Sequence, residues 1–211
     1  MKRPLIAREG WPIIFVLLGL TVLVGLWSRL LALLPGALLA LSLWFFRDPE
    51  RPVVEDENAV VAPADGRVMF VKTVQEPRYL KSEAILVSIF LSIFDVHFNR
   101  IPVSGTVTYR DYMKGRFLAA WGETVGEVNE RAYVGIDTGK HRVLVSQVAG
   151  LVARRIITWP QVGDQVRRGE RFGLIRFGSC TQIWLPPGST VLVKPGDRVL
   201  GGQTIIGRLP E

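Results

Sequence analysis

Two long apolar runs near the N-terminus constrain this chain more than any other feature. They extend from Trp11 to Trp27 and from Leu30 to Phe46, and Ser28-Arg29 separates them. Each run has about 17 residues, at the short end of what crosses a hydrocarbon core of about 30 Å at roughly 1.5 Å per residue. Because lipid or protein must cover such segments, we predict a hydrophobic, membrane-associated helical hairpin over residues 1–51.

The charges around this hairpin favour a location in the cell membrane, with the rest of the chain on the cytoplasmic side. The flanking basic residues are Lys2, Arg3, Arg8, Arg47 and Arg51. Positive residues stay on the cytoplasmic face. Since Pro35-Gly36 interrupts the second run, a shallow re-entrant hairpin is an alternative to a full span. A cleaved signal peptide fits less well, because the apolar region is doubled and no small-residue cleavage site follows it. A buried pair of soluble helices is a weaker alternative.

Overall charge and cysteine content narrow the function classes. Lys and Arg total 26 against 19 Asp and Glu, a net charge of +7, so anionic partners are expected. An anionic membrane surface fits the hairpin. A nucleic-acid-binding module does not, because the chain lacks an aromatic-basic strand motif. The single cysteine, Cys180, excludes an internal disulfide framework, and no Cys/His cluster predicts a metal site.

From Pro52 onward the chain has short runs rich in valine and isoleucine, broken by glycine and proline, which is typical of β structure. We therefore predict a β-rich domain over residues 52–211, with a short helix or turn at Ser92–Phe98. The predicted strands are Ala59–Val61, Gly66–Val74, Ala84–Leu91, Gly105–Tyr112, Arg131–Asp137, Arg142–Gln147, Gly150–Ile157, Gly173–Phe177, Thr181–Leu185 and Thr190–Val193.

A short internal repeat indicates the kind of β domain. Gly163-Asp164-Gln165-Val166 with Gly169 matches Gly196-Asp197-Arg198-Val199 with Gly202, 33 positions later. The repeat predicts two turns of one type, in which glycines supply positive φ. It resembles turns of biotinyl and lipoyl carrier domains, although neither copy presents the carrier lysine. The predicted fold is thus mainly β, a sandwich or barrel-hybrid domain preceded by the hairpin.

Three segments carry the plausible reactive groups: residues 62–66 (Ala-Pro-Ala-Asp-Gly), residues 94–100 (Phe-Asp-Val-His-Phe-Asn-Arg) and Gly178-Ser179. Taken singly, none is specific, and most Gly-Ser pairs form turns. Glycine nevertheless leaves a carbonyl sterically open to attack. Of the two histidines, His97 is favoured over His141, which lies in a Gly-Lys-His segment typical of an exposed turn.

Together these segments resemble the phosphatidylserine decarboxylases, in their short bacterial and archaeal branch. Further matching segments are residues 46–49 (Phe-Arg-Asp-Pro), Asn129-Glu130-Arg131 and Gly169-Glu170, in family order. The resemblance implies a proenzyme that cuts itself between Gly178 and Ser179. The products would be a β chain, residues 1–178, and an α chain, residues 179–211, that stay together as a heterodimer, with further oligomers left open.

The resemblance also assigns roles to the reactive groups. His97, oriented by Asp65, would remove the proton of Ser179, whose oxygen attacks the Gly178 carbonyl and converts the peptide to an ester. Elimination and hydrolysis would then turn residue 179 into a covalent pyruvoyl group. This cofactor would form a Schiff base with phosphatidylserine and serve as electron sink, giving phosphatidylethanolamine and carbon dioxide.

Other residues are expected to support the site or the substrate. The supporting residues implied by the resemblance are Asn99, Arg100, Asn129, Glu130 and Arg131. Arg154 and Arg155 are candidates for contact with anionic headgroups.

Two departures from the pattern bear on these roles. Arg100 stands where longer relatives have a second histidine, so His97 would serve both processing and decarboxylation. Cys180 replaces the usual threonine, and we interpret it as a small strand residue rather than a second nucleophile.

Two alternatives remain open at the level of sequence. One is a decarboxylase of another serine-headgroup lipid, such as an archaeal-type ether lipid. The other is a membrane-tethered, carrier-like binding domain that never cleaves itself.

Overall fold

The chain is represented by a computed structural model that describes residues 5–52, 54–118, 128–151, 156–175 and 179–211. Residues 1–50 form one compact unit and residues 51–211 form another.

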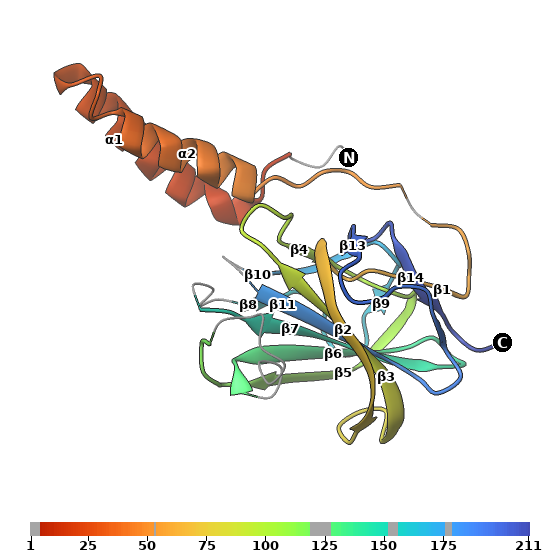
Figure 1. Ribbon diagram of the computed structural model, residues 1–211. Coiled ribbons are helices and arrows are strands. Elements are labelled where there is room, and N and C mark those ends of the chain that lie inside the picture. Colours follow the sequence, from red (N-terminus) through yellow and green to blue (C-terminus); the bar gives the residue numbers. More distant parts are fainter. Residues whose placement is uncertain (1–4, 53, 119–127, 152–155, 176–178) are drawn as a thin grey trace. The chain divides into compact units, whose positions relative to one another are not determined.

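The N-terminal unit is a pair of helices that lie side by side (Figure 1). A short 3-10 turn, η1 (Arg8–Gly10), leads into α1 (Trp11–Trp27), which has a proline in its first turn, where no backbone donor is lost. The second helix, α2 (Leu33–Phe45), begins three residues later than the second apolar run, because residues 28–32 form the connecting turn. The predicted helical pair is therefore confirmed.

Only one helix in the described part of this unit has the length and composition to cross a membrane. It runs from Arg8 to Trp27, 20 residues, and α2 is shorter. At roughly 1.5 Å per residue, the 13 residues of α2 fall short of a hydrocarbon core of about 30 Å.

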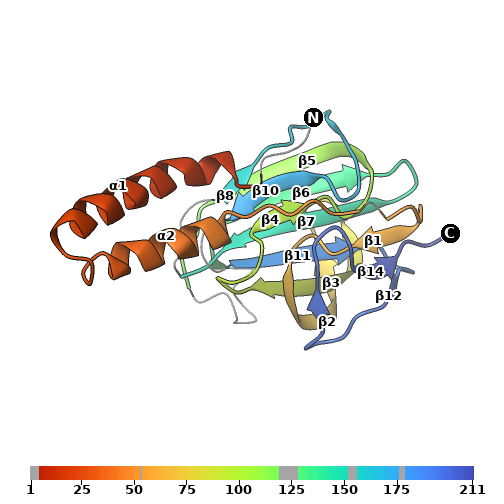
Figure 2. The same cartoon turned by 90° about the horizontal axis from the view of Figure 1, so that it is seen from above.

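The second unit is built on an eight-stranded antiparallel sheet that curls on itself, with strand order β13-β2-β3-β11-β7-β6-β5-β9 (Figures 1 and 2). Its strands are β2 (Gly66–Glu76), β3 (Ser82–Leu91), β5 (Gly105–Met113), β6 (Arg131–Asp137), β7 (Arg142–Ala149), β9 (Gln165–Val166), β11 (Ser179–Leu185) and β13 (Arg198–Val199). Strand β11 lies in the interior of the sheet, paired with β3 on one side and β7 on the other.

Two three-stranded sheets complete the unit. One contains β1 (Ala59–Val61), β14 (Ile205–Arg208) and β12 (Thr190–Val191), and the other contains β4 (Phe98–Arg100), β10 (Arg171–Ile175) and β8 (Ile156–Thr158). The main apolar core lies between these strands and one face of the large sheet, where side chains such as Val68, Ile89 and Ile183 are buried. This arrangement confirms the predicted mainly β class.

The two copies of the internal repeat form the same turn. Backbone N–H groups of Gln161 and Lys194 donate to the carboxylates of Asp164 and Asp197, at 2.8 and 2.9 Å. The four repeat glycines, Gly163, Gly169, Gly196 and Gly202, all have positive φ, as predicted. A Cβ built on Gly202 would lie 3.3 Å from the Cα of Gly169, so the equivalent glycines of the two copies pack against each other.

The predicted strands agree with the structure, with a few exceptions. Strands β1 and β6 match the predictions Ala59–Val61 and Arg131–Asp137. The strand predicted over Gly150–Ile157 is wrong at its start, because Leu151 lies in a bend and β8 begins at Ile156. Residues 152–155 and 176–178 lie outside the described residues. Four strands were not predicted, β4, β9, β13 and β14; three of them are only two or three residues long. Between β3 and β4 the chain forms a turn rather than a helix.

Gly66 is the glycine of the segment 62–66, and its geometry makes it hard to replace. Its φ is +151°, and a Cβ at this position would collide with the backbone carbonyl of Phe90 on β3. We expect Gly66→Ala to lower the free energy of unfolding by about 3 kcal/mol or more, since backbone strain and a backbone collision add.

Gly139 is the matched control, because it also has positive φ but has open space around it. Gly139→Ala should cost only about 1 kcal/mol. Urea or thermal unfolding measures both variants, and equal losses would contradict this reading of Gly66.

Candidate active site

Ser179 is the first residue of β11 and is held from both sides. Its backbone pairs with Leu91 of β3 and Ala149 of β7, and the residue is 0% exposed. Its Oγ is buried and has no hydrogen-bond partner among the described residues. A buried hydroxyl without a partner costs about 1–3 kcal/mol, so its presence calls for an explanation, and a reactive role is one. The preceding residue, Gly178, lies outside the described residues.

Beside Ser179, a chain of polar side chains crosses the inner face of the sheet. Residues alternate along a strand, so Thr181 lies on the same face as Ser179. The Asn99 amide donates to Thr181 Oγ1 at 3.0 Å, and the Gln147 amide donates to Asn99 Oδ1 at 2.8 Å. Thr158 donates to Gln147 Oε1 at 2.6 Å. All these groups except Thr158 are fully buried, and their mutual bonds fix the rotamers next to the serine.

His97 is fully buried in the turn between β3 and β4. Its Nδ1 lies 2.8 Å from the backbone carbonyl of Asp95. Because a carbonyl oxygen can only accept, Nδ1 carries the proton and the lone pair of the neutral ring is on Nε2. His97 and the Ser179 hydroxyl are not hydrogen-bonded to each other in this structure.

Asp95 fixes the turn that carries His97. Its Oδ2 accepts hydrogen bonds from the Ser92 N–H at 2.9 Å and the Ser92 hydroxyl at 2.7 Å. Its Oδ1 forms an ion pair with Arg198 at 2.7 Å, which ties the turn to β13. The orientation of the histidine therefore rests on Asp95, through both its side chain and its carbonyl.

Asp65 was expected to orient His97, but its carboxylate has other partners. Oδ2 forms a buried ion pair with Arg51 at 2.7 Å, and Oδ1 accepts the Gly201 N–H at 2.8 Å. Arg51 also donates to the Gln203 side chain at 3.1 Å. Asp65 thus joins the start of the second unit to the second repeat turn, and the partner of His97 Nδ1 is the Asp95 carbonyl.

Asn129 is a supporting residue that bonds a strand neighbour of Ser179. Its amide donates to the carbonyl of Ala149, the β7 partner of Ser179, at 2.8 Å. The same side chain exchanges hydrogen bonds with the backbone N–H and carbonyl of Leu118, at 3.0 and 2.8 Å. Asn129 therefore holds the segment before residue 119 against the strand beside the serine.

The remaining predicted supporting residues, Glu130, Arg131 and Arg100, make contacts with other parts of the chain. The Glu130 carbonyl accepts the Ala149 N–H at 2.8 Å. Arg131 is buried and donates to the Asn129 carbonyl at 3.0 Å. Arg100 donates to the carbonyl of Gly169, in the first repeat turn, at 3.0 Å. The candidates Arg154 and Arg155 lie outside the described residues.

Sequence reasoning included Asp95 in a reactive segment without giving it a role, and it missed Gln147, Thr158 and Thr181. The spacing of Ser92 and Asp95 is that of a side chain capping its own turn, a signal available in the sequence. Gln147 and Thr158 carried no such signal, because only strand pairing brings them beside Asn99. In the described part of the chain no group of three or more His, Cys, Asp or Glu residues could hold a metal ion.

Comparison with known proteins identifies the family. The phosphatidylserine decarboxylase family model matches residues 38–207. A phosphatidylserine decarboxylase proenzyme of Symbiobacterium thermophilum is 64% identical over 212 residues, covering 100% of this chain and 99% of the relative. Proenzymes of the same description from Carboxydothermus hydrogenoformans and Geotalea uraniireducens are 48% and 42% identical, each covering 99% of both chains.

A family model that spans most of the chain, and relatives this similar over their full length, confirm the resemblance carried by the three segments. The chain belongs to the phosphatidylserine decarboxylase family.

Proposed function

We propose that this chain is a proenzyme that cuts itself between Gly178 and Ser179 and then decarboxylates phosphatidylserine to phosphatidylethanolamine and carbon dioxide. The observation that carries the proposal is the Ser179 hydroxyl, buried without a partner at the head of an interior strand. The family and the proenzyme description of its relatives support it.

In the processing step, the Ser179 hydroxyl gives its proton to His97 Nε2, and its oxygen bonds to the Gly178 carbonyl carbon. The bond between that carbon and the Ser179 nitrogen breaks, and the nitrogen takes the proton, which leaves an ester. Loss of the Ser179 Cα proton then breaks the Cβ–O bond and releases the Gly178 carboxylate. Water enters and ammonia leaves, so residue 179 ends as a pyruvoyl group.

The tautomer of His97 supports its role as the base. With Nδ1–H held by the Asp95 carbonyl, Nε2 is the atom that can accept a proton. Asp95, paired with Arg198 and bonded to Ser92, keeps this turn in place when the ring becomes charged. We assign Asp65 a supporting role through Arg51 and Gly201, which hold the neighbouring segment.

The surroundings of Ser179 also fit the group that it would become. Since β11 pairs along its length with β3 and β7, cleavage before residue 179 would leave the 179–211 piece bound to the rest of the chain. This supports a heterodimer of the two pieces. A pyruvoyl group supplies a carbonyl that bonds to the substrate amine and takes up the electrons left when carbon dioxide departs. Asn99 and Thr181 would position the residue, and His97 would return a proton to the substrate carbon.

A lipid substrate is consistent with the rest of the chain. The apolar helix Arg8–Trp27 supports attachment to a membrane, and the net charge of +7 favours an anionic surface. We propose the cytoplasmic side for the β-rich unit, because basic residues flank the helical pair. Another serine-headgroup lipid would undergo the same chemistry.

Cys180 does not compete with Ser179 as a nucleophile. It lies on the opposite face of β11, and burial raises the pKa of its thiol to about 11. The thiol is therefore protonated at neutral pH, and its Sγ lies 3.1 Å from the Ser88 hydroxyl.

Cleavage at residue 179 is tested by intact mass spectrometry of the purified full-length protein. We expect two pieces, 1–178 and 179–211, the second lighter by one ammonia than an unmodified peptide. Ser179→Ala should remain one chain and lose decarboxylation, because no hydroxyl can attack.

Cys180→Ala is the matched control at the next residue, and it should be cleaved as the parent protein is. Cleavage of Ser179→Ala, or a single intact chain for an active parent protein, would refute the proposal and favour the carrier-like alternative.

His97→Gln tests the base, since glutamine keeps a polar side chain of similar length but cannot take a proton at neutral pH. We expect processing at least about 100-fold slower, as removal of a general base typically costs. His141→Gln is the control, because that ring bonds the carbonyl of Pro210 at 3.1 Å and has no role in the proposal. Time courses of cleavage by gel or mass spectrometry measure both, and normal processing of His97→Gln would reassign the base.

A further inference from the structure

A cavity lies on the face of the large sheet opposite Ser179. It has a volume of about 370 Å³ and is lined by residues of β2, β3, β6 and β11 and by the hairpin between β2 and β3. Gln182 and Trp184 reach it from β11, whereas Ser179, Thr181 and Ile183 alternate to the other face. The cavity is thus separate from the site described above, although both use β11.

The lining carries an excess of positive charge. Its cationic residues are Lys72, Arg78 and Arg131, and its one acidic residue is Glu76. The Glu76 carboxylate is occupied by the backbone, because it accepts N–H groups of Arg78, Tyr79 and Leu80 at 2.9, 2.8 and 2.7 Å. With three cations against one carboxylate, the cavity favours an anion.

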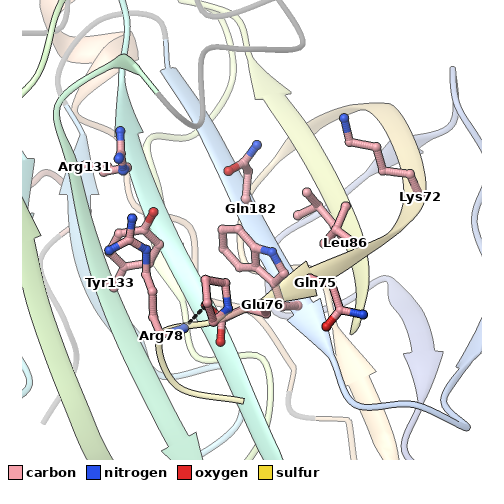
Figure 3. Close-up of a pocket in the computed structure, with 11 residues that line it drawn as sticks. Lys72, Gln75, Glu76, Arg78, Leu86, Arg131, Tyr133 and Gln182 are labelled. Carbon is pink, nitrogen blue, oxygen red and sulfur yellow. Dashed lines mark hydrogen bonds between the residues drawn. The ribbon is translucent and has the colours of Figure 1, made fainter. Parts of the chain in front are cut away.

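The two guanidinium groups are held in place before any ligand arrives. Arg78 lies over the Tyr133 ring at 5.2 Å from its centroid, and Arg131 donates to the Asn129 carbonyl at 3.0 Å. Figure 3 shows Arg131 and Tyr133 on one side of Gln182, with Lys72 and Leu86 on the other. Pre-positioned arginines lose little side-chain entropy when they bind a planar or tetrahedral anion.

The side chain of Gln182 is a second feature, besides the positive charge, that suits the cavity to a ligand. The residue is only 3% exposed and lines the cavity, and its side-chain amide makes no hydrogen bond within the described part of the chain. Its amide atoms are not among the fully buried ones without a partner, so they are open to the cavity. Its neighbour across the strand pair, Ser146, has a buried hydroxyl that likewise has no partner among the described residues. The cavity therefore presents an amide donor that the described part of the protein does not use.

We propose that this cavity binds a phosphoryl group, with Arg78, Arg131 and Lys72 facing its charge and the Gln182 amide donating to one of its oxygens. A phosphoryl group suits the lining better than a carboxylate does, because it offers three or more acceptor oxygens to several donors at once. The group could belong to a soluble phosphate or to a lipid headgroup. This inference does not depend on the reaction at Ser179.

The test uses the full-length protein in a phosphate-free detergent. Inorganic phosphate is titrated against chloride at constant ionic strength, and the side-chain amide resonance of Gln182 is followed by NMR. Gln182→Leu assigns that resonance by its loss. We expect a saturable shift with phosphate and none with chloride; absence of a saturable shift would overturn the proposal.

Arg78→Ala should weaken phosphate binding about tenfold or more, because it removes a charge-assisted hydrogen bond. Lys81→Ala is the matched control, since Lys81 is exposed on the same hairpin, carries the same charge and does not line the cavity. Isothermal titration measures both. Equal affinity for the two variants would overturn the proposal, and so would sedimentation evidence that a second copy of the chain covers Gln182.

Vesicles distinguish the two sources of the phosphoryl group. If vesicles of phosphatidylcholine with phosphatidic acid shift the Gln182 amide resonance at a far lower phosphoryl concentration than inorganic phosphate does, the source is a lipid. If inorganic phosphate and these vesicles act at the same phosphoryl concentration, the site takes soluble phosphate. Vesicles of phosphatidylcholine alone should have no effect in either case, and a shift with them that persists in Arg78→Ala would contradict the proposed lining.

Discussion

The site depends on the pairing of β11 with β3 and β7. Ser179 is the first residue of this interior strand, and both of its neighbours, Leu91 and Ala149, belong to long strands of the same sheet. Because the backbone of β11 is hydrogen-bonded to a neighbouring strand on each side, the serine is held in place without help from its own side chain. The hydroxyl is left buried and unpaired, which is unfavourable for stability and suited to a group that must react.

The same pairing explains how a chain could be cut at residue 179 and remain one structure. The piece that begins at Ser179 contains an interior strand and also β12, β13 and β14, which pair with strands of the first piece or with each other. Two repeat turns hold the surrounding segments. The second turn contributes Arg198 to Asp95 and the Gly201 N–H to Asp65, so it braces both acidic residues. The first turn accepts a hydrogen bond from Arg100, at the carbonyl of Gly169.

Much of this fold follows from patterns that are local in the sequence. The helical pair follows from apolar length, most strands from valine and isoleucine runs, and the positive φ of Gly163 and Gly196 from a repeat with glycine at fixed offsets. Short strands such as β13 were missed because two residues carry no period, and pairing with β2 is what makes them strands. The partners of the site residues were missed for the same reason. Only the folded structure brings Gln147 next to Asn99. It also pairs the Asp65 carboxylate with Arg51, where we had expected it to orient His97.

The central claim, that residue 179 carries the group that bonds to the substrate, is tested most directly by reductive trapping. The purified protein is treated with borohydride in the presence of phosphatidylserine, and its pieces are separated and weighed by mass spectrometry. The account predicts a substrate adduct on the first residue of the 179–211 piece, and its loss when phosphatidylcholine replaces phosphatidylserine. An active protein that gives no adduct, or an adduct on a lysine of residues 1–178, would contradict it.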